Sequence, residues 1–261
     1  MVSYSIAHLS DPHLRAGALS TAPADALHTA LRSVLALDPP PDCVVITGDL
    51  VEHGTPEEYQ VLREVLTGFP LPLKLVAGNH DDPRALIAVF GGSRFLGRSP
   101  KTHYSEEFDG FTLLTLNSWQ AGVPSGRVSA GQLEWLDSTL TEHRGKPAFV
   151  SLHHPPTPVG IPFLDGMRLE NGQELAAVLE RHPHVVRVLA GHVHRHVTVP
   201  FAESLLSIAP STHLASGLAM TGAVPHYRAE PTSFLLHVGE GPHWVTHTVP
   251  VSHTSAPLAG F

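Results

Sequence analysis

The chain has 261 residues, enough for one large α/β domain, and its 42% hydrophobic and 15% charged residues exclude a disordered or repetitive protein. Its formal net charge of −8 argues against a broad basic surface for polymeric nucleic acid but does not exclude a small anionic substrate. Twenty histidines beside one cysteine favour nitrogen and oxygen ligands for transition metals over thiolate sites.

The sequence shows no targeting or membrane-spanning signal. The opening MVSYSIAHLSDPH lacks the basic, apolar and small-residue segments of a signal peptide, and no later apolar run is long enough to span a membrane. We therefore expect a cytoplasmic protein without a membrane partner, in which Cys43 is a buried small side chain. We expect residues 1–250 to form a single domain and residues 251–261 to be a flexible tail.

The first part of the chain alternates short apolar runs with helical patterns. Thr55 as N-cap, Pro56 at the first position and Glu58 three residues after the cap predict the start of one helix. This alternation predicts a βαβ-type sheet. In chain order, the expected elements are a strand at 4–10, a helix over 24–37, a strand at 43–49, a helix over 55–66, a strand from 73 and a short helix over 83–90.

The middle and end of the chain contain further strands and helices. His103–Ser118 is typical of two strands joined by a hairpin turn at Asp109-Gly110. The remaining expected elements are helices over 129–140 and 171–181, and strands at 147–154, 185–192, 196–202, 204–210, 232–238 and 244–251.

Two capping patterns and one long loop complete the expected fold. Ser129 with Gln132, and Asn171 with Glu174, predict capped helix starts. Residues 210–231 are rich in Gly, Pro, Ser and Ala, which predicts a long loop. Together these elements predict an α/β protein whose mixed two-sheet core has helices outside.

Five short motifs contain metal-ligand residue types, and each falls where an expected strand ends. Ligands of α/β sheets gather at such strand ends. Any one motif alone is more often turn chemistry, but together they supply mixed oxygen and nitrogen ligands for two adjacent cations. The motifs are D-x-H at Asp11 and His13, G-D at Gly48 and Asp49, G-N-H-D at Gly78 to Asp81, His-His-Pro-Pro from His153, and G-H-x-H at Gly191 to His194.

These motifs resemble those of the calcineurin-like metallophosphoesterase superfamily, and within it the bacterial class III cyclic-nucleotide and glycerophosphodiester phosphodiesterases. The similarity extends from about Ile6 to His194 and includes the stretches DGMRLENGQEL and IAPST. It implies a four-layer α/β/β/α sandwich of two mixed β-sheets flanked by helices. It also implies small phosphodiester substrates, and a homodimer or higher homo-oligomer that uses the late loop and the C-terminal strands.

The resemblance further implies how two metal ions would be held. His80 would face the substrate without binding metal. His153, rather than His154, would be a ligand because the family's histidine lies two positions before a proline; His154 would lie behind the ligands or in the pocket. One metal would be held by Asp11, His13, Asp49 and His194. The other would be held by Asp49, Asn79, His153 and His192, with Asp49 as the bridge.

The chemistry of phosphodiester hydrolysis suits these residue types. Two cations about 3.5–4 Å apart neutralise the phosphate oxygens, lower the pKa of a bridging water and orient its attack. A bridging carboxylate keeps two cations that close, and imidazole ligands favour Mn, Fe, Zn or Co over Mg and Ca. A protonated His80 could stabilise the developing charge or protonate the leaving alkoxide. Asp81 or Asp82 could orient His80 or cap the following helix.

Other residues have no metal-ligand pattern. Trp119, Phe163 and Met167 either line a base or alcohol pocket or pack the loops down. The remaining histidines fit no metal spacing with each other, and we expect them at the surface or the core edge. For His196, beside the last motif, a role as metal ligand is the less favoured alternative. The remaining histidines include His182, His184, His196, His213, His226, His237, His243, His247 and His253.

Two other functions remain open at the level of sequence. One is a nucleotide phosphomonoesterase or pyrophosphohydrolase, and the other is a non-catalytic interaction module of the same fold. The sequence has no G-x-S-x-G elbow and no phosphate-binding P-loop motif, so serine-nucleophile and P-loop chemistry are unsupported. Relatives commonly have Asp-Ser or Asp-Thr where this chain has Asn117-Ser118, and Gly-Glu-Leu at its Gly126-Arg127-Val128, which bears on the pocket or the dimer contacts.

Overall fold

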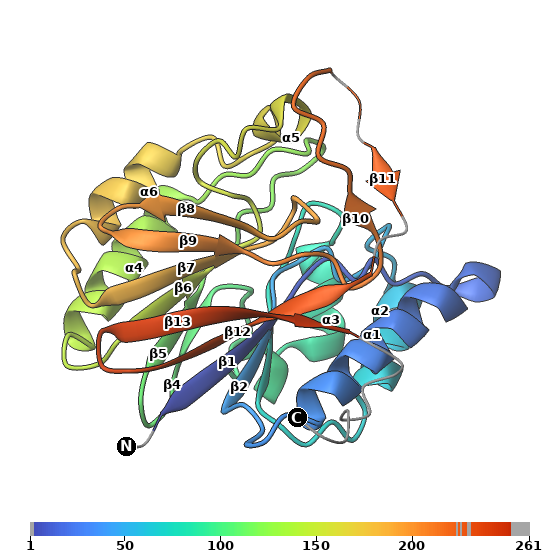
Figure 1. Ribbon diagram of the computed structural model, residues 1–261, viewed down its shortest axis with the longest axis horizontal. Helices are drawn as coiled ribbons and strands as arrows, with labels where there is room; N and C mark the ends of the chain where they lie inside the picture. The colour runs from blue at the N-terminus through green and yellow to red at the C-terminus, as the bar shows by residue number, and fades with distance from the viewer. Residues whose placement is uncertain (1–2, 223, 225, 229–230, 252–261) are drawn as a thin grey trace, which may run out of the picture.

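Two mixed β-sheets form the interior of the computed structural model, which describes residues 3–222, 224, 226–228 and 231–251 (Figure 1). The first sheet has the strand order β13-β12-β1-β2-β3 and the second β4-β5-β6-β7-β9-β8. The strands of the first sheet are β1 (Tyr4–Leu9), β2 (Cys43–Ile46), β3 (Leu73–Leu75), β12 (Ser233–Glu240) and β13 (His243–Pro250). Those of the second are β4 (Tyr104–Glu107), β5 (Thr112–Thr115), β6 (Ala148–Ser151), β7 (Val185–Ala190), β8 (Val197–Phe201) and β9 (Ser204–Ile208).

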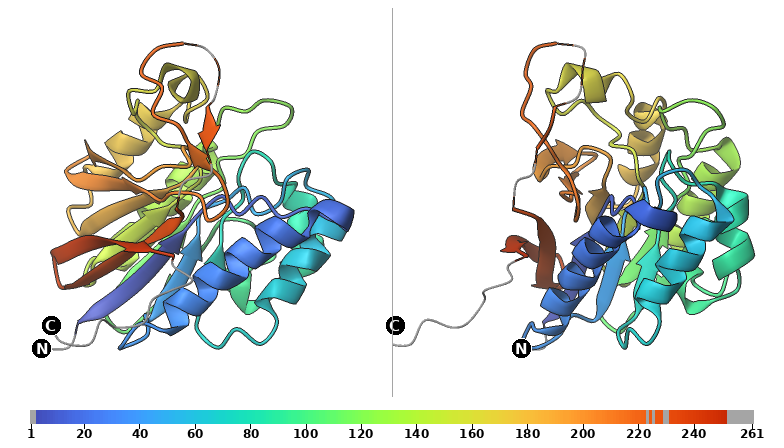
Figure 2. Two further views of the ribbon diagram at one scale, coloured as in Figure 1. Left: turned by 45° about the vertical axis from the view of Figure 1, so that its right-hand side comes forward. Right: turned by 90° about the vertical axis from the view of Figure 1, so that its right-hand side faces the viewer.

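Helices cover the outer face of each sheet (Figure 2). On α2, the spacing of the buried side chains Tyr59, Leu62 and Leu66 gives one apolar stripe that packs on the first sheet. The predicted four-layer α/β/β/α sandwich is therefore confirmed. The helices on the first sheet are α1 (Thr21–Leu35), α2 (Pro56–Leu66) and α3 (Pro83–Phe90); those on the second are α4 (Ala130–Glu142), α5 (Pro162–Asp165) and α6 (Gly172–Leu179); the short 3-10 helices are η1 (Gly17–Leu19) and η2 (Arg94–Leu96).

Side chains of the two sheets pack against each other in the space between the sheets. On β2, Val44 and Ile46 belong to the cluster beneath the helices, whereas Cys43 and Val45 belong to the cluster that includes residues of both sheets. Successive side chains of a strand point to opposite faces, so a strand that is covered on both faces must be apolar throughout. Cys43 is fully buried, which confirms its predicted role as a small core side chain.

The parallel strands bring distant parts of the chain to one edge. Strands β1, β2 and β3 are parallel in one sheet, and β5, β6, β7 and β9 are parallel in the other. A parallel bridge between Ser10 and Ser211 joins the ends of β1 and β9. The loops that leave these strands therefore converge, which is the arrangement that the five motifs require.

Helix caps agree with the sequence at Thr55 and at Ser129, whose hydroxyl accepts the N–H of Gln132, and differ at Asn171. The side chain of Thr55 accepts the N–H of Glu58, and the carboxylate of Glu58 accepts the N–H of Thr55, as predicted. Asn171 stands at the start of α6, but its side chain caps no helix N–H. It instead binds both backbone groups of Val128, and its Nδ2 donates to Glu174. A tertiary contact has replaced the local cap.

The structure describes most of the late loop but almost none of the predicted tail. Residues 210–231 contain a short two-stranded ladder of β10 (Ala215–Ser216) and β11 (Tyr227–Arg228), which corrects the prediction of a loop alone. Of the predicted tail, 251–261, only Val251 lies within the described residues. Among the described residues, no helix is long and apolar enough to cross a membrane.

Candidate metal centre

The structure brings all seven predicted ligand residues together at the edge where parallel strands of both sheets end. Six of them are buried and Asn79 is half-buried. Buried polar groups need partners, so this concentration of imidazole and carboxylate groups must be satisfied by one another, by the backbone or by a cation. Asp11 and His13 follow β1, Asp49 follows β2, Asn79 follows β3, His153 follows β6, and His192 and His194 follow β7.

The first group of donors consists of Asp11, His13, Asp49 and His194, whose ligand atoms lie within 4.8 Å of one another. The Nε2 atoms of His13 and His194 are 3.1 Å apart. Asp49 Oδ2 is 3.6 Å from the Nε2 of His13, and Asp11 Oδ1 is 3.5 Å from the Nε2 of His194. This set matches the predicted ligands of one metal.

The other ring nitrogens of this group show how it fits a cation. His13 pairs through Nδ1 with Glu52 Oε2 at 2.9 Å, and His194 donates from Nδ1 to the carbonyl of Leu214 at 2.8 Å. If both rings were neutral, each Nε2 lone pair would point toward the other, and a cation bound between them would satisfy both. Burial opposes a charge on His13, but the carboxylates of Glu52, Asp49 and Asp11 together raise its pKa. The donors therefore fit a metal ion.

The second group of donors lies on the other side of Asp49. His153 Nε2 is 3.0 Å from Asn79 Oδ1, 3.2 Å from His192 Nδ1 and 3.4 Å from Asp49 Oδ1. Asn79 Oδ1 is also 2.9 Å from His192 Nδ1. His153 donates from Nδ1 to the carbonyl of Thr47 at 2.7 Å, which leaves its Nε2 as the lone-pair donor. The two oxygens of Asp49 thus face different groups.

His154 lies close to His153 and His192, but both of its ring nitrogens are used elsewhere. Its Nε2 donates to the carbonyl of Pro124 at 3.1 Å, and its Nδ1 accepts the hydroxyl of Ser118 at 2.8 Å. Neither nitrogen keeps a free lone pair for a metal. The geometry therefore agrees with the prediction that His154 lies behind the ligands.

Backbone strain is concentrated at this site. Five of the seven residues have positive φ, which is uncommon for residues other than glycine. Two motif glycines leave room for ligand side chains: a Cβ on Gly48 would lie 2.4 Å from His153 Nδ1, and one on Gly78 would lie 2.3 Å from Asp49 Oδ1. The motifs therefore fix backbone shape as well as chemistry. The five residues are Asp11 (φ 50°), His13 (48°), Asp49 (45°), His192 (71°) and His194 (56°).

His80 is exposed beside the two groups. Its backbone N–H donates to Asp49 Oδ1 at 2.9 Å, and its ring lies 4.8 Å from that of His13. Its Nδ1 donates to the carbonyl of Glu52 at 2.9 Å, so within the described part of the chain Nε2 is the ring nitrogen that remains for a further partner. Glu52 lies outside the five motifs and was not predicted, yet it holds His80 through its backbone and His13 through its side chain. Its partner His13 lowers the pKa of Glu52 to about 2, and Arg15 lies 3.4 Å from its other oxygen.

The two carboxylates after His80 have structural partners. Asp82 caps α3 by accepting the N–H groups of Arg84 and Ala85. Asp81 is buried and accepts the N–H groups of Leu50 and Gly78 and the hydroxyl of Tyr59. Of the two roles weighed for this pair, capping therefore holds for Asp82, while Asp81 ties two motif loops together.

A cavity of about 430 Å³ opens beside His80. Trp119 lines it, whereas Phe163 and Met167 pack against the hydrophobic cluster of the second sheet. Asn117 accepts the N–H of Trp119 at 3.0 Å and pairs through its backbone with the side chain of Gln132. Asn117 therefore shapes this wall of the cavity. The complete lining is His53, Asn79, His80, Asp81, Asp82, Trp119, Gln120, Gly122, Val123 and Pro124.

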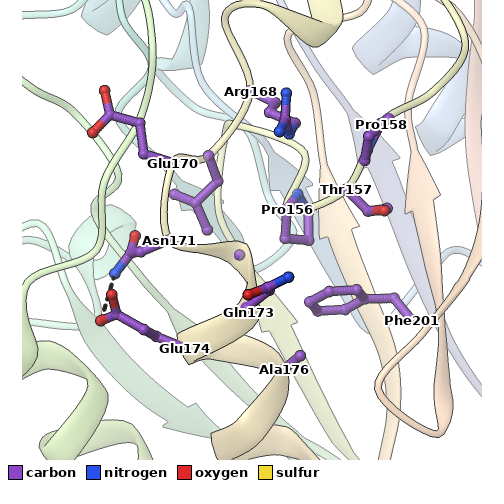
Figure 3. A pocket seen from close by; sticks show the side chains of 12 residues that line it. Pro156, Thr157, Pro158, Arg168, Glu170, Asn171, Gln173, Glu174, Ala176 and Phe201 are labelled. Atoms are coloured by element: carbon purple, nitrogen blue, oxygen red, sulfur yellow. Dashed lines mark hydrogen bonds between the residues drawn. The ribbon is translucent and has the colours of Figure 1, made fainter.

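A second cavity, of about 460 Å³, lies near the start of α6 (Figure 3). It is lined by Pro156–Pro158 and Arg168–Glu174, with Ala176 and the ring of Phe201, and it includes none of the eight predicted site residues. A Cβ on Gly172 would lie 1.9 Å from the carbonyl oxygen of Pro156. The stretch DGMRLENGQEL thus packs closely against the His-His-Pro-Pro loop and supports it.

The histidines outside the motifs are not all at the surface. His237 is fully buried and His182 is almost so, which corrects the prediction for both, because stacked sheets and packed helices bury positions that carry no local apolar pattern. His182 pairs with Asp137 at 2.7 Å. His196 pairs through Nδ1 with Thr248 at 2.9 Å and belongs to neither donor group. His253 lies outside the described residues.

Stacked sheets between helices, with carboxylate, amide and imidazole donors gathered at one edge, define an α/β protein with a candidate two-metal centre. The chain belongs to the calcineurin-like phosphoesterase family, whose model matches residues 4–196. This match confirms the resemblance seen in the motifs.

Two relatives and one solved structure illustrate the similarity. Glycerophosphodiester phosphodiesterase GpdQ of Enterobacter lignolyticus is 32% identical over 260 residues, covering 97% of this chain and 93% of the relative. The 3′,5′-cyclic adenosine monophosphate phosphodiesterase CpdA of Escherichia coli is 34% identical over 173 residues, covering 66% of this chain and 61% of the relative. A dimetal phosphatase from Danio rerio has a TM-score of 0.67 at 17% identity, covering 95% of this chain and 99% of that chain, which shows the shared fold.

Proposed function

We propose that this chain hydrolyses small phosphodiesters, such as 3′,5′- or 2′,3′-cyclic nucleotides or glycerophosphodiesters, with two metal ions. The position of Asp49 is the main support. Its Oδ2 faces His13 at 3.6 Å and its Oδ1 faces His153 at 3.4 Å, so one carboxylate serves two donor groups. A shared carboxylate is what keeps two cations close enough to act on one phosphoryl group. The names of both relatives agree with this activity.

The ligand assignment follows the two donor groups. Bound ions would supply positive charge for the phosphate oxygens and an activated water for attack. Mixed imidazole, amide and carboxylate donors suit Mn, Fe, Zn or Co. Asp11, His13, Asp49 and His194 would hold one ion, and Asp49, Asn79, His153 and His192 the other.

His80 is proposed as the catalytic histidine that binds no metal. Its Nδ1–H is already donated to the carbonyl of Glu52, so the protonated ring has only its Nε2–H to give. His80 also lines the cavity beside the donor groups, where the leaving oxygen of a bound diester would lie. From this position it can transfer its Nε2 proton to the leaving oxygen.

The charge of the cavity favours diesters over the alternative substrates. The described residues that line it include no Lys or Arg, so no fixed cation is available there for the second charge of a phosphomonoester or for a pyrophosphate. A non-catalytic module is disfavoured because all seven ligand positions and His80 are filled.

We expect faster hydrolysis of bis(p-nitrophenyl) phosphate than of p-nitrophenyl phosphate when Mn²⁺ is added. The two compounds share a leaving group and differ in phosphoryl charge, so the ratio of their kcat/KM values isolates the preference for a diester. Faster turnover of the monoester would overturn the proposed activity.

Trp119 is expected to recognise an aromatic base. Its ring lines the cavity next to His80, and stacking of one base on an aromatic side chain contributes about 1–3 kcal/mol. Trp119→Ala should therefore raise KM for a cyclic nucleotide about tenfold or more, whereas Trp119→Phe should retain most of the affinity. KM for a glycerophosphodiester should change little. Equal increases for both substrates would show that Trp119 only packs the loop.

The predicted homodimer or higher homo-oligomer is also a proposal. Apolar side chains are exposed on the late loop, which extends beyond the strand ends (Figure 1). Exposed apolar surface of this kind is typical of an interface. The exposed side chains are Leu218, Met220, Val224 and Tyr227.

The single domain over residues 1–250, the cytoplasmic location, and the absence of membrane and polymeric nucleic-acid partners stay predictions.

A further inference from the structure

Two histidines outside the metal motifs lie fully buried between the sheets. His8 is on β1, and His237 is on β12 opposite Ile6 of β1. Ile6 belongs to the apolar cluster between the sheets, so strand alternation directs His8 to the same side. Burying a polar ring is unfavourable unless its nitrogens are paired, so the partners of these nitrogens decide how the two rings are accommodated.

Every ring nitrogen of this pair has a partner. The Nδ1 of His237 is 2.8 Å from the hydroxyl of Thr246, and its Nε2 is 3.3 Å from the Nδ1 of His8. The Nε2 of His8 is 2.9 Å from the hydroxyl of Thr47. By contrast, one ring nitrogen of the buried His182 has no partner among the described residues. The four side chains form a continuous row from the edge strand β13 to the end of β2.

The direction of these hydrogen bonds follows from counting protons. Burial lowers the pKa of His8 to about 3 and that of His237 well below its ordinary value, so each ring carries a single N–H. The hydroxyl of Thr47 donates to Ser10 at 2.8 Å and therefore accepts from His8 Nε2. His8 Nδ1 then accepts from His237 Nε2, and His237 Nδ1 accepts from Thr246.

The row ends at a residue that holds a proposed metal ligand. The carbonyl of Thr47 accepts the Nδ1–H of His153 at 2.7 Å, and the hydroxyl of Ser10 donates to the same carbonyl at 3.3 Å. Thr47 is thus fixed through both its side chain and its backbone. Removing a group that orients a metal-binding histidine commonly weakens metal affinity 10–100-fold.

We propose that His237 and His8 are positioning residues that orient His153 through Thr47, so that the C-terminal hairpin β12–β13 helps to form the second metal site. This hairpin lies beyond residues 4–196, which match the family model. The inference rests on the proposed function only in that the chain must bind two ions.

Metal titration of the full chain tests this proposal without an activity assay. Free Mn²⁺ is followed by its electron paramagnetic resonance signal while the ion is added to wild type, His237→Leu, His237→Gln and Thr47→Val. His237→Gln keeps an N–H donor near the Nε2 position, whereas His237→Leu removes it and Thr47→Val removes the hydroxyl that His8 contacts. We expect the second ion to bind about tenfold more weakly to the Leu and Val variants and nearly normally to the Gln variant, with the first ion unaffected.

His182→Leu is the matched control, because it also removes a buried histidine but one that pairs with Asp137 away from the row. An equal weakening in this control would mean that general destabilisation is the cause and would overturn the proposal. Normal binding of the second ion by Thr47→Val would also overturn it, even if His237→Leu did not fold. A wild-type chain that binds only one ion would instead refute the proposed function.

Discussion

Asp49→Asn should reduce kcat/KM for bis(p-nitrophenyl) phosphate by about 10³-fold or more, which corresponds to about 4 kcal/mol of transition-state stabilisation. The two oxygens of Asp49 face separate donor groups, at 3.6 Å from His13 and 3.4 Å from His153. An amide has almost the same shape, and its oxygen can still accept the N–H of His80, but it has no charge and cannot bind two cations. The loss should therefore come from the metal centre rather than from the fold.

Asp137→Asn provides the control for this substitution. Asp137 is a carboxylate at the surface that pairs with His182 and Arg181, remote from the donor groups. Its replacement should leave turnover unchanged. If Asp49→Asn turned over the diester as fast as Asp137→Asn, Asp49 would not be the bridge.

His80→Ala should lower kcat by about 10²- to 10⁴-fold while the metal content remains that of the wild type. The ring of His80 lines the cavity, and its Nε2 is the ring nitrogen left free by the bond from Nδ1 to the carbonyl of Glu52. A proton donor matters most when the leaving group is a poor one. The loss should therefore be larger for a cyclic nucleotide or a glycerophosphodiester than for a p-nitrophenyl diester.

The dependence on the leaving group separates this role from others. His243→Ala, which removes an exposed histidine of β13, should leave kcat unchanged for both substrates. An equal loss for alkyl and p-nitrophenyl leaving groups would show that His80 stabilises charge rather than transfers a proton. A loss of bound metal would show that it supports the ligands instead.

The sequence predicted the fold and the clustering of the donors because both follow from local patterns. Strands such as Cys43–Ile46 are apolar throughout, and the motif residues follow them directly. Parallel strands of one sheet present their carboxyl ends at a common edge, which groups Asp11 with Asp49. His194 follows a strand of the other sheet, so the resemblance of the motifs, not strand direction, predicted its place beside Asp11.

Features that depend on tertiary contacts could not be predicted in this way. Asn171 has the sequence of an N-cap, but its side chain forms hydrogen bonds with the backbone of Val128 instead. Glu52 is a single charged residue within a loop, and its two contacts exist only after β1 and β3 have paired with β2. The burial of His8 and His237 results from the stacking of the sheets, which no periodicity along one strand reveals.

The ratio of metal to protein in Asn79→Ala and His192→Ala tests the central claim most directly. Both residues belong to the donor group of His153, where Asn79 Oδ1 is 2.9 Å from His192 Nδ1. After loading with Mn²⁺ and removal of free metal, wild type should contain two ions per chain, and each variant should contain one and lose most diesterase activity. Two ions with unchanged turnover in either variant, or a single ion in the wild type, would contradict the two-metal assignment.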